Sequence, residues 1–367
     1  MISEKVMGVW TDTFHQTRLL KHTAVGQRKR LHIFFVAGNP GTLHFYVSFL
    51  QSIFAGLVSG DFCSSYDTIS CHGVGHANHH VEGSSSSSSR SHPSDDAEKY
   101  NLEFQICHKL VFISSVLEET RRNDGNCNSN ADVMMIGHSI GCYIVLDMLE
   151  RCEQLRLKTK FINLLMPFIF WSKIPFMHRA KLSSYVALHP MSQHLITSLV
   201  STFLKVGSTK RKKLIAMISG EKGHQLDTIA DGLVNKRIVN NFLSMGFDEI
   251  RDVKLNENRM LSLLQSLDED NMNGKKDIFI LYTDHDEWAP EADAVMLRTK
   301  LKNSTTIVTE PGLTHGFCMT DIRNDRTCTI LVNHLNRIKS LSAEDDSANT
   351  ANYHRKEGSF MRRMSKL

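Results

Sequence analysis

The chain has 367 residues, of which 41% are hydrophobic, and a formal net charge of +4. This length suffices for one large domain with an insertion, and so mild a charge excludes any case for a nucleic-acid partner. The first 20 residues lack the apolar core of a secretory signal, and the eight cysteines include no C-x-x-C pair, so we expect reduced thiols facing the cytosol.

The first informative segment is an apolar run that leads into a loop with two glycines. Residues 31–36 predict a strand, residues 37–41 (AGNPG) form the loop, and a helix is expected to begin near Thr42. Glycines allow a backbone to approach a ligand closely. The loop is compatible with an ordinary turn or with a backbone donor at a reaction site.

A histidine-rich stretch comes next and runs into a Ser-rich loop at residues 83–96. Five histidines lie before or within this loop: His72, His76, His79, His80 and His92. Such a cluster is one signature of a metal site. The Gly- and Ser-rich composition is more typical of a disordered loop, so we expect no metal ligands here.

The most informative motif is the G-x-S-x-G sequence at residues 137–141. An apolar, strand-like run precedes it at residues 132–136, and apolar residues at helical spacing follow it at residues 142–149. Strand, sharp turn and helix form the setting of a nucleophile elbow, which holds a serine in a strained conformation between glycines. We therefore predict that Ser139 is a nucleophile.

A nucleophilic serine of this kind also needs two backbone N–H groups that bind the oxyanion. One donor is predicted to be Ile140, because it directly follows the serine. The other should come from the loop at residues 37–41. Pro40 has no N–H, so Asn39 and Gly41 both remain candidates.

Between the elbow and the next strand lies an insertion at about residues 168–270. Residues 161–177 are almost wholly apolar, but two prolines and a lysine interrupt them, and a membrane span needs about 20 residues. Residues 190–217 place apolar side chains at helical spacing and include the basic run 210–213. This pattern fits a helix that lies in a lipid surface, and it also fits a cap packed over an active site.

Two later strands end in loops that carry acids and a histidine. Residues 276–282 lead into a loop with Asp284 and Asp286, and residues 305–309 lead into a loop with His315. Loops at the carboxyl ends of strands are where an open α/β sheet keeps its site. Serine, then acid, then histidine is the chain order of α/β-hydrolases. The residues alone leave Asp284 and Asp286 both open.

Several motifs together resemble those of the lipid droplet-associated hydrolase family, from about residue 31 to residue 335. They are Gly38-Asn39-Pro40-Gly41 with Phe45, Tyr46 and Phe49; Gly75-His76; Leu102 with Gln105, His108 and Lys109; Gly137 to Gly141; Asp286-Glu287-Trp288-Ala289-Pro290; and His315-Gly316-Phe317-Cys318. The chain departs from the family pattern in its serine tract, Ser84 to Ser89, and in Phe168-Ile169-Phe170-Trp171, which replaces a polar stretch.

The resemblance implies an α/β-hydrolase fold with a mostly parallel central sheet and a helical cap insertion. It implies Ser139, Asp286 and His315 as the catalytic set, with no metal or cofactor. It also implies action on neutral lipid esters, of the sterol ester or acylglycerol type, at the monolayer of lipid droplets or the cytosolic face of the endoplasmic reticulum. It favours lipid contact for residues 161–217. No protein partner is indicated.

We therefore expect one hydrolase domain over residues 1–341 and a disordered, polar tail over residues 342–367. The predicted function is a serine hydrolase of lipid esters. The alternative is a droplet-surface scaffold with a hydrolase fold and little turnover, in which the insertion provides the function. An intact triad favours the enzyme, because a scaffold has no need to keep three such residues in register.

Overall fold

The computed structural model describes most of the chain apart from several loops and both ends. The described ranges are 2–21, 29–79, 100–123, 131–171, 208–219, 236–272, 276–301 and 305–338, with a few residues between 192 and 230. The predictions for the serine tract, for the tail from residue 342 and for most of residues 172–207 lie outside these ranges.

The centre of the fold is an eight-stranded sheet in the order β1-β2-β4-β3-β5-β6-β7-β8. Its strands are β1 (Ile2–Val6), β2 (Val9–Leu19), β3 (Arg30–Val36), β4 (Thr68–Val74), β5 (Ala131–His138), β6 (Thr159–Leu165), β7 (Asp277–Thr283) and β8 (Thr306–Glu310). The pairings β1 with β2 and β2 with β4 are antiparallel, and all the others are parallel. The predicted mostly parallel sheet is therefore confirmed.

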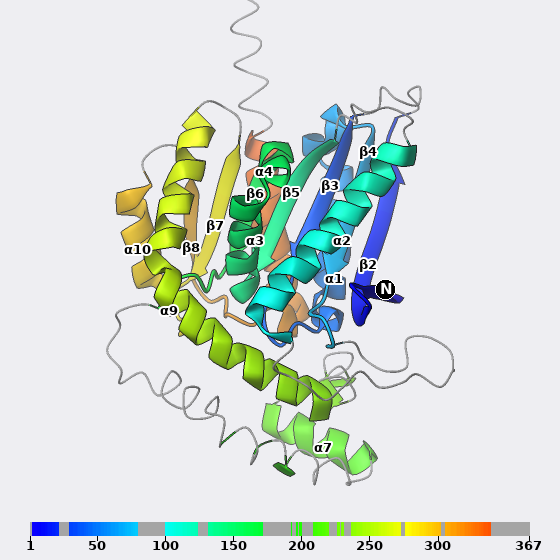
Figure 1. Ribbon diagram of the computed structural model, residues 1–367, viewed down its shortest axis with the longest axis vertical. Helices are drawn as coiled ribbons and strands as arrows, with labels where there is room; N and C mark the ends of the chain where they lie inside the picture. Colours follow the sequence, from blue (N-terminus) through cyan, green and yellow to red (C-terminus); the bar gives the residue numbers. More distant parts are fainter. Residues whose placement is uncertain are drawn as a thin grey trace, which may run out of the picture.

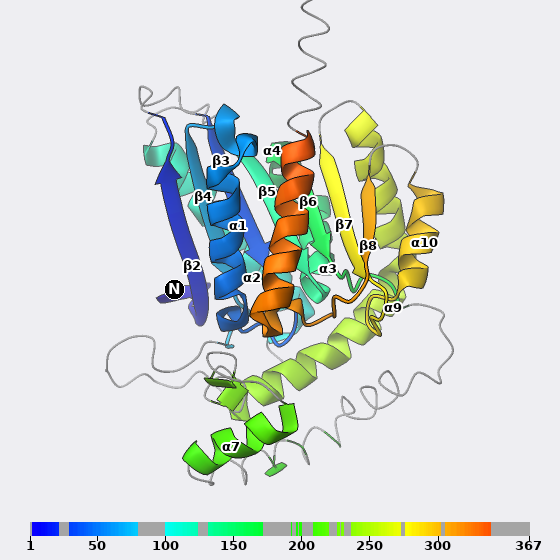
Figure 2. The same cartoon turned by 180° about the vertical axis from the view of Figure 1, so that it is seen from behind.

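Helices cover both faces of this sheet. On one face lie α2 (Leu102–Asn123) and α3 (Ile140–Arg151), with the short α4 (Glu153–Lys158) between α3 and β6 in the chain (Figure 1). On the other face lie α1 (Val47–Ser59) and the helix at 321–338 (Figure 2). Because both faces are covered, the central strands are near-continuous apolar runs, and all but the first residue of β3 are buried.

The carboxyl ends of the parallel strands meet at one edge, and a long helix crosses that edge. This helix, α9 (Lys236–Met272), runs with its first half across the sheet edge and then turns up beside β7 (Figures 1 and 2). The shorter helix α7 (Ser208–Ser219) lies beyond α9, on the side away from the sheet (Figures 1 and 2). A further helix, α10 (Glu291–Lys300), packs beside β8.

The prediction that the histidines near the serine tract lie in a disordered loop is wrong for three of them. His72 belongs to β4 and is buried, with its ring stacked 5.0 Å from that of Phe34. His76 and His79 follow β4 directly and are also buried. β4 pairs with β2 on one side and with β3 on the other, and helices cover both faces of the sheet, which accounts for the burial of His72. Over the described residues, no group of three or more His, Cys, Asp or Glu is arranged to hold a metal ion.

The prediction of lipid contact from residue 161 onward is wrong for the first part of that range. Residues 159–165 form β6, which pairs with β5 on one side and β7 on the other. Residues 168–170 are buried in the main core. Both segments are apolar because they are buried, the first in a central strand and the second in the core. Within the part of the chain that the structure describes, none of the helices combines the length and hydropathy of a transmembrane span.

Candidate active site

Ser139 occupies a sharp turn between β5 and α3. Its backbone has φ 55° and ψ −125°, a conformation that is unfavourable for a residue with a side chain. A Cβ on Gly137 would lie 2.8 Å from Cys142 Cα, and a Cβ on Gly141 would lie 2.3 Å from the Val36 carbonyl oxygen. The two flanking glycines are therefore a steric requirement of this turn.

The side chains of Ser139, His315 and Asp286 form a continuous hydrogen-bonded line. Ser139 Oγ lies 2.7 Å from His315 Nε2, and His315 Nδ1 lies 2.7 Å from Asp286 Oδ2. An ionised carboxylate only accepts hydrogen bonds, so the proton on His315 sits on Nδ1. Nε2 is then free to accept the hydroxyl proton of the serine, which is the arrangement of a general base beside its nucleophile.

The Asp286 carboxylate is held by its own loop. Its Oδ1 accepts hydrogen bonds from the backbone N–H groups of Trp288 at 2.8 Å and Ala289 at 2.9 Å. Burial by itself would raise the pKa of Asp286, but the adjacent His315 and these two donors keep the pKa below its ordinary value. The carboxylate therefore stays ionised and can orient the imidazole.

Asp284, the other acid that the sequence left open, faces a different partner. Its Oδ1 accepts the Gly312 N–H at 3.1 Å and the Thr283 hydroxyl at 3.2 Å. The bond from Gly312 joins the loop after β7 to the loop after β8. Asp284 therefore braces the two loops that carry Asp286 and His315, and only Asp286 bonds to the imidazole.

The loop at residues 38–41 lies directly against the elbow. A Cβ on Gly38 would sit 2.8 Å from Ser139 Cβ, so only glycine permits this approach. Gly41 has φ +74°, and its N–H donates to the Gly38 carbonyl at 2.7 Å. The Gly41 N–H is thus used within the loop, which leaves Asn39 as the candidate oxyanion donor. The Ile140 N–H is the first of α3, where helical N–H groups have no intrahelical partner.

His138 connects the elbow to the loop that carries His315, and the sequence did not indicate this role. Its Nε2 lies 2.8 Å from the His315 carbonyl oxygen, and its Nδ1 lies 2.8 Å from the Tyr46 hydroxyl. The carbonyl requires a donor, so Nε2 carries the proton and Nδ1 accepts from Tyr46. Burial, together with the nearby His315, lowers the pKa of His138 to about 3, so its ring stays neutral.

The segment that follows β6 packs against the elbow. The Phe168 N–H donates to the Ser139 carbonyl at 3.2 Å, and the Phe168 ring packs edge-on against Trp288 at 5.5 Å. The segment that departs from the family pattern is therefore packed into the core against the backbone of Ser139, and Phe168 is only 1% exposed.

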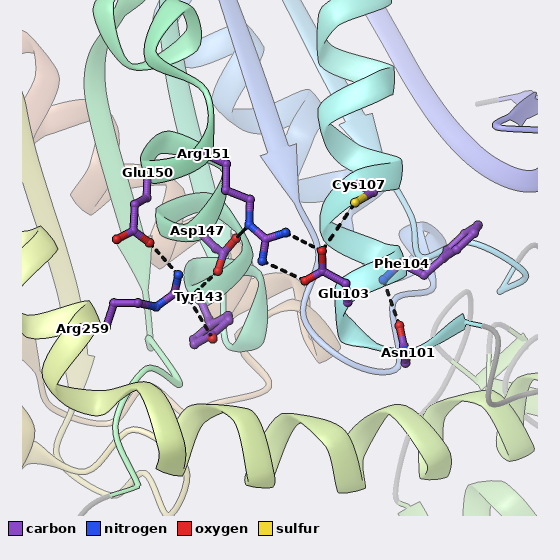
Figure 3. A network of polar contacts seen from close by, with 9 residues as sticks. All are labelled: Asn101, Glu103, Phe104, Cys107, Tyr143, Asp147, Glu150, Arg151 and Arg259. Atoms are coloured by element: carbon purple, nitrogen blue, oxygen red, sulfur yellow. Dashed lines mark hydrogen bonds and ion pairs between the residues drawn. The ribbon is translucent and has the colours of Figure 1, made fainter.

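The helix that carries Ile140 is tied to both of its neighbours by ion pairs (Figure 3). Asp147 on α3 is buried and pairs with Arg151 on the same helix and with Arg259 on α9. Arg151 also pairs with Glu103 on α2. Arg259 in addition bonds to Glu150 at 2.6 Å. The helix behind the elbow is thus connected to α2 and to the second half of α9.

The strand order, the elbow and the position of its serine define an α/β-hydrolase. Solved structures agree on the fold at low sequence identity. A haloalkane dehalogenase variant from Bradyrhizobium elkanii matches with a TM-score of 0.54 and 10% identity, over 91% of this chain and 99% of its own. A soluble variant of monoglyceride lipase from Saccharomyces cerevisiae matches with a TM-score of 0.50 and 11% identity, over 91% and 94%.

The chain belongs to the lipid-droplet associated hydrolase family, whose profile matches residues 29–318. The human lipid droplet-associated hydrolase is 31% identical over 159 residues, which are 42% of this chain and 41% of the relative. The protein of the same name from Pongo abelii is 25% identical over 217 residues, which are 54% and 58%. The chain thus matches less than two thirds of the length of these relatives.

Proposed function

We propose that this chain is a serine hydrolase that cleaves lipid esters, with Ser139 as nucleophile, His315 as general base and Asp286 as the orienting acid. The observation that carries the proposal is the line of two 2.7 Å hydrogen bonds from Ser139 Oγ through the imidazole to the Asp286 carboxylate. The strained turn at the serine and the membership of the family support it.

The reaction follows from the positions of these groups. As Ser139 Oγ attacks the ester carbonyl carbon, its proton passes to His315 Nε2, and the N–H groups of Ile140 and Asn39 bind the oxyanion. The carbon–oxygen bond to the alcohol then breaks, and His315 returns the proton to the departing alcohol. Water attacks the acyl-serine with His315 again as base, which releases the carboxylic acid and restores the Ser139 hydroxyl.

The substrate proposed for this site is a neutral lipid ester of the sterol ester or acylglycerol type. Membership of the lipid-droplet associated hydrolase family supports a lipid ester as the substrate. The relatives are named for association with lipid droplets, which supports a substrate drawn from such particles.

We also propose that α7 rests on the surface of the droplet. Lys210, Lys213, Leu214 and Met217 are all exposed, and their spacing places them on one face of this helix. Cations beside exposed apolar side chains suit a monolayer with anionic headgroups, since burial of apolar area and charge attraction act together. The contact is peripheral and requires no spanning segment.

Labelling with a fluorophosphonate tests the enzyme against the scaffold alternative. Wild-type protein should be labelled and should hydrolyse lipid esters, whereas Ser139→Ala should fold normally and lose both, by several orders of magnitude in turnover. Full activity in Ser139→Ala would remove the hydrolase proposal. A wild-type protein that coats droplets but is neither labelled nor active would instead support the scaffold.

Flotation with triolein emulsions tests the droplet surface. The double variant Leu214→Ser, Met217→Ser should release the protein into the aqueous phase, and raised salt should weaken the remaining binding. Leu157→Ser serves as the matched control. Leu157 is also an exposed apolar residue, at 65%, but it lies on α4 before β6, at the opposite end of the strands. Equal flotation of wild type and double variant would contradict a role for α7.

A further inference from the structure

The loop at residues 38–41, which we call the oxyanion loop, is held by the turn that follows β4. The His76 N–H donates to the Gly41 carbonyl at 2.9 Å, and Nδ1 of His79 donates to the Pro40 carbonyl. The two segments touch, because a Cβ on Gly41 would lie 2.2 Å from the His76 ring. The turn therefore sets where the oxyanion loop lies.

The turn is fastened to α2 by the side chain of Gln105, which is fully buried. This helix begins at the edge of the sheet where β4 ends (Figure 1). Gln105 Oε1 accepts the Ala77 N–H at 2.8 Å, and Gln105 Nε2 donates to the Ala77 carbonyl at 3.4 Å. Ala77 stands between His76 and His79 in the chain. One side chain of α2 thus binds both backbone polar groups of a central residue of the turn.

The amide of Gln105 uses its full hydrogen-bonding capacity. Its Oε1 also accepts from Lys109 Nζ at 2.7 Å, and its Nε2 also donates to the Tyr100 carbonyl at 3.2 Å. A side-chain amide has two acceptor positions and two N–H hydrogens, so these four bonds satisfy it completely. The Ala77 N–H can only donate and the Tyr100 carbonyl can only accept. The orientation of the amide is therefore fixed by its neighbours.

Contacts from α9 reach the same region at other points. Asn39 Nδ2 donates to the Phe242 carbonyl of α9 at 3.0 Å. The carbonyl of Asn78, the residue after Ala77, accepts from two side chains of α9 at 2.9 and 3.1 Å. These bonds hold the Asn39 side chain and the far end of the turn. The bonds from Gln105 to Ala77 are distinct from them and come from a helix that packs on the face of the sheet.

We propose that Gln105 is a positioning residue for oxyanion binding. By fixing Ala77, it keeps His76 and His79 against the oxyanion loop, and so keeps the Asn39 N–H where the oxyanion develops. This inference rests on the proposed function, because it takes Asn39 as the second oxyanion donor. A donor displaced by a fraction of an ångström binds the transition state less well but changes substrate binding little.

Inhibition by a trifluoromethyl ketone measures this arrangement directly. Ser139 Oγ adds to the ketone carbonyl carbon, the hydroxyl proton passes to His315, and the resulting alkoxide occupies the oxyanion position. Gln105→Met keeps a side chain of similar length and removes all four hydrogen bonds. Since loss of one oxyanion donor costs about 100- to 1000-fold in turnover, a misplaced donor should cost about 10- to 100-fold. We expect ketone inhibition and kcat for p-nitrophenyl butyrate to weaken together by that factor, with KM changed by less than about threefold.

His79→Phe tests the other end of the same route. It keeps an aromatic ring but loses the donor to the Pro40 carbonyl, so kcat and ketone inhibition should again fall together while KM changes little. The double variant Gln105→Met, His79→Phe should be no worse than the more impaired single variant, because both substitutions release the same loop. If Gln105→Met does not fold, His79→Phe carries the test.

Ile113→Ala is the stability control, because Ile113 is buried on the same helix about two turns beyond Gln105. It should lower the Tm without changing inhibition by the ketone. Ketone inhibition unchanged in both Gln105→Met and His79→Phe would overturn the inference, as would an Ile113→Ala variant as impaired as Gln105→Met. A wild-type protein that neither hydrolyses the ester nor binds the ketone would refute the proposed function itself, which is a separate outcome.

Discussion

Acidification to about pH 5 should destabilise this protein chiefly through its buried histidines. Burial, with a contribution from Lys109, lowers the pKa of His108 from 6.5 to about 2. Burial and His315 lower the pKa of His138 from 6.5 to about 3. Burial also lowers the pKa of His72 and of His76 well below 6.5. All four rings are neutral in the folded protein.

The sign of the effect follows from proton linkage. The unfolded chain binds protons to these rings near pH 6.5, whereas the folded chain binds them only far lower, so stability falls as the pH drops below about 6.5. One unit of pKa difference corresponds to about 1.36 kcal/mol, so at pH 5 each ring removes about 2 kcal/mol. His108 and His138 together remove about 4 kcal/mol, and His72 and His76 act in the same direction. The total stability of a domain is about 5–15 kcal/mol.

Urea unfolding at about pH 7.5, 6.5, 5.5 and 5.0 measures this loss directly as a fall in midpoint. His108→Gln, which keeps an acceptor at this position, should reduce the loss between pH 7.5 and pH 5 by about 2 kcal/mol. His285→Gln is the control, because the His285 side chain is 89% exposed, and it should leave the loss unchanged. A midpoint that does not change between pH 7.5 and pH 5 would refute the reasoning.

Three substitutions, two of them paired with a comparison variant, test other parts of the structure. Asp286→Asn should lower kcat by about 1000- to 10,000-fold, and Asp284→Asn by less than about tenfold, because of the two acids only Asp286 bonds to the His315 imidazole. The opposite ranking in purified protein would contradict the proposed roles. Tyr46→Phe removes the hydroxyl that donates to Nδ1 of the buried His138. It should lower the free energy of unfolding by about 1–3 kcal/mol and kcat by about tenfold. An unchanged kcat would exclude a positioning role for Tyr46. Asp147→Ala should lower the free energy of unfolding by about 2 kcal/mol, which is less than for a fully buried pair because its two arginine partners are each 35% exposed. Glu150→Ala should lower it by less than about 0.5 kcal/mol. Equal effects of the two substitutions in urea unfolding would argue against the network of Figure 3.

The sequence by itself determined the parts of the site that depend on neighbours along the chain. The elbow is of this kind, because the glycines at 137 and 141 and the strand and helix around them all lie within about 20 residues. The turn that holds Asp286 is another, since its donors are two and three residues away. The buried strands could also be predicted from the sequence, because strands covered on both faces are near-continuous apolar runs.

Composition gave a wrong prediction in two situations: where a polar segment is buried, and where an apolar segment that suggested a lipid-binding surface lies in the core. His72 belongs to a strand that is covered on both faces, although its neighbourhood in the sequence is polar. The hairpin of β1 and β2 has no apolar run, and β2 is placed in the sheet by backbone pairing with residues of β4 that lie 49 to 61 positions further along the chain. Residues 168–170 suggested a surface for lipid but pack inside the core.

Only the tertiary structure could bring together groups that are distant in the chain. His138 meets the His315 carbonyl across 177 positions, and Asn39 meets Phe242 across 203. Nothing in the local sequence of either residue encodes such a contact, because side-chain periodicity reports which face is buried but not what covers it. The chain order predicted which residues would meet at the carboxyl edge of the sheet. The tertiary structure also decided that the Gly41 N–H bonds within its own loop and that the Asn39 side chain bonds to α9.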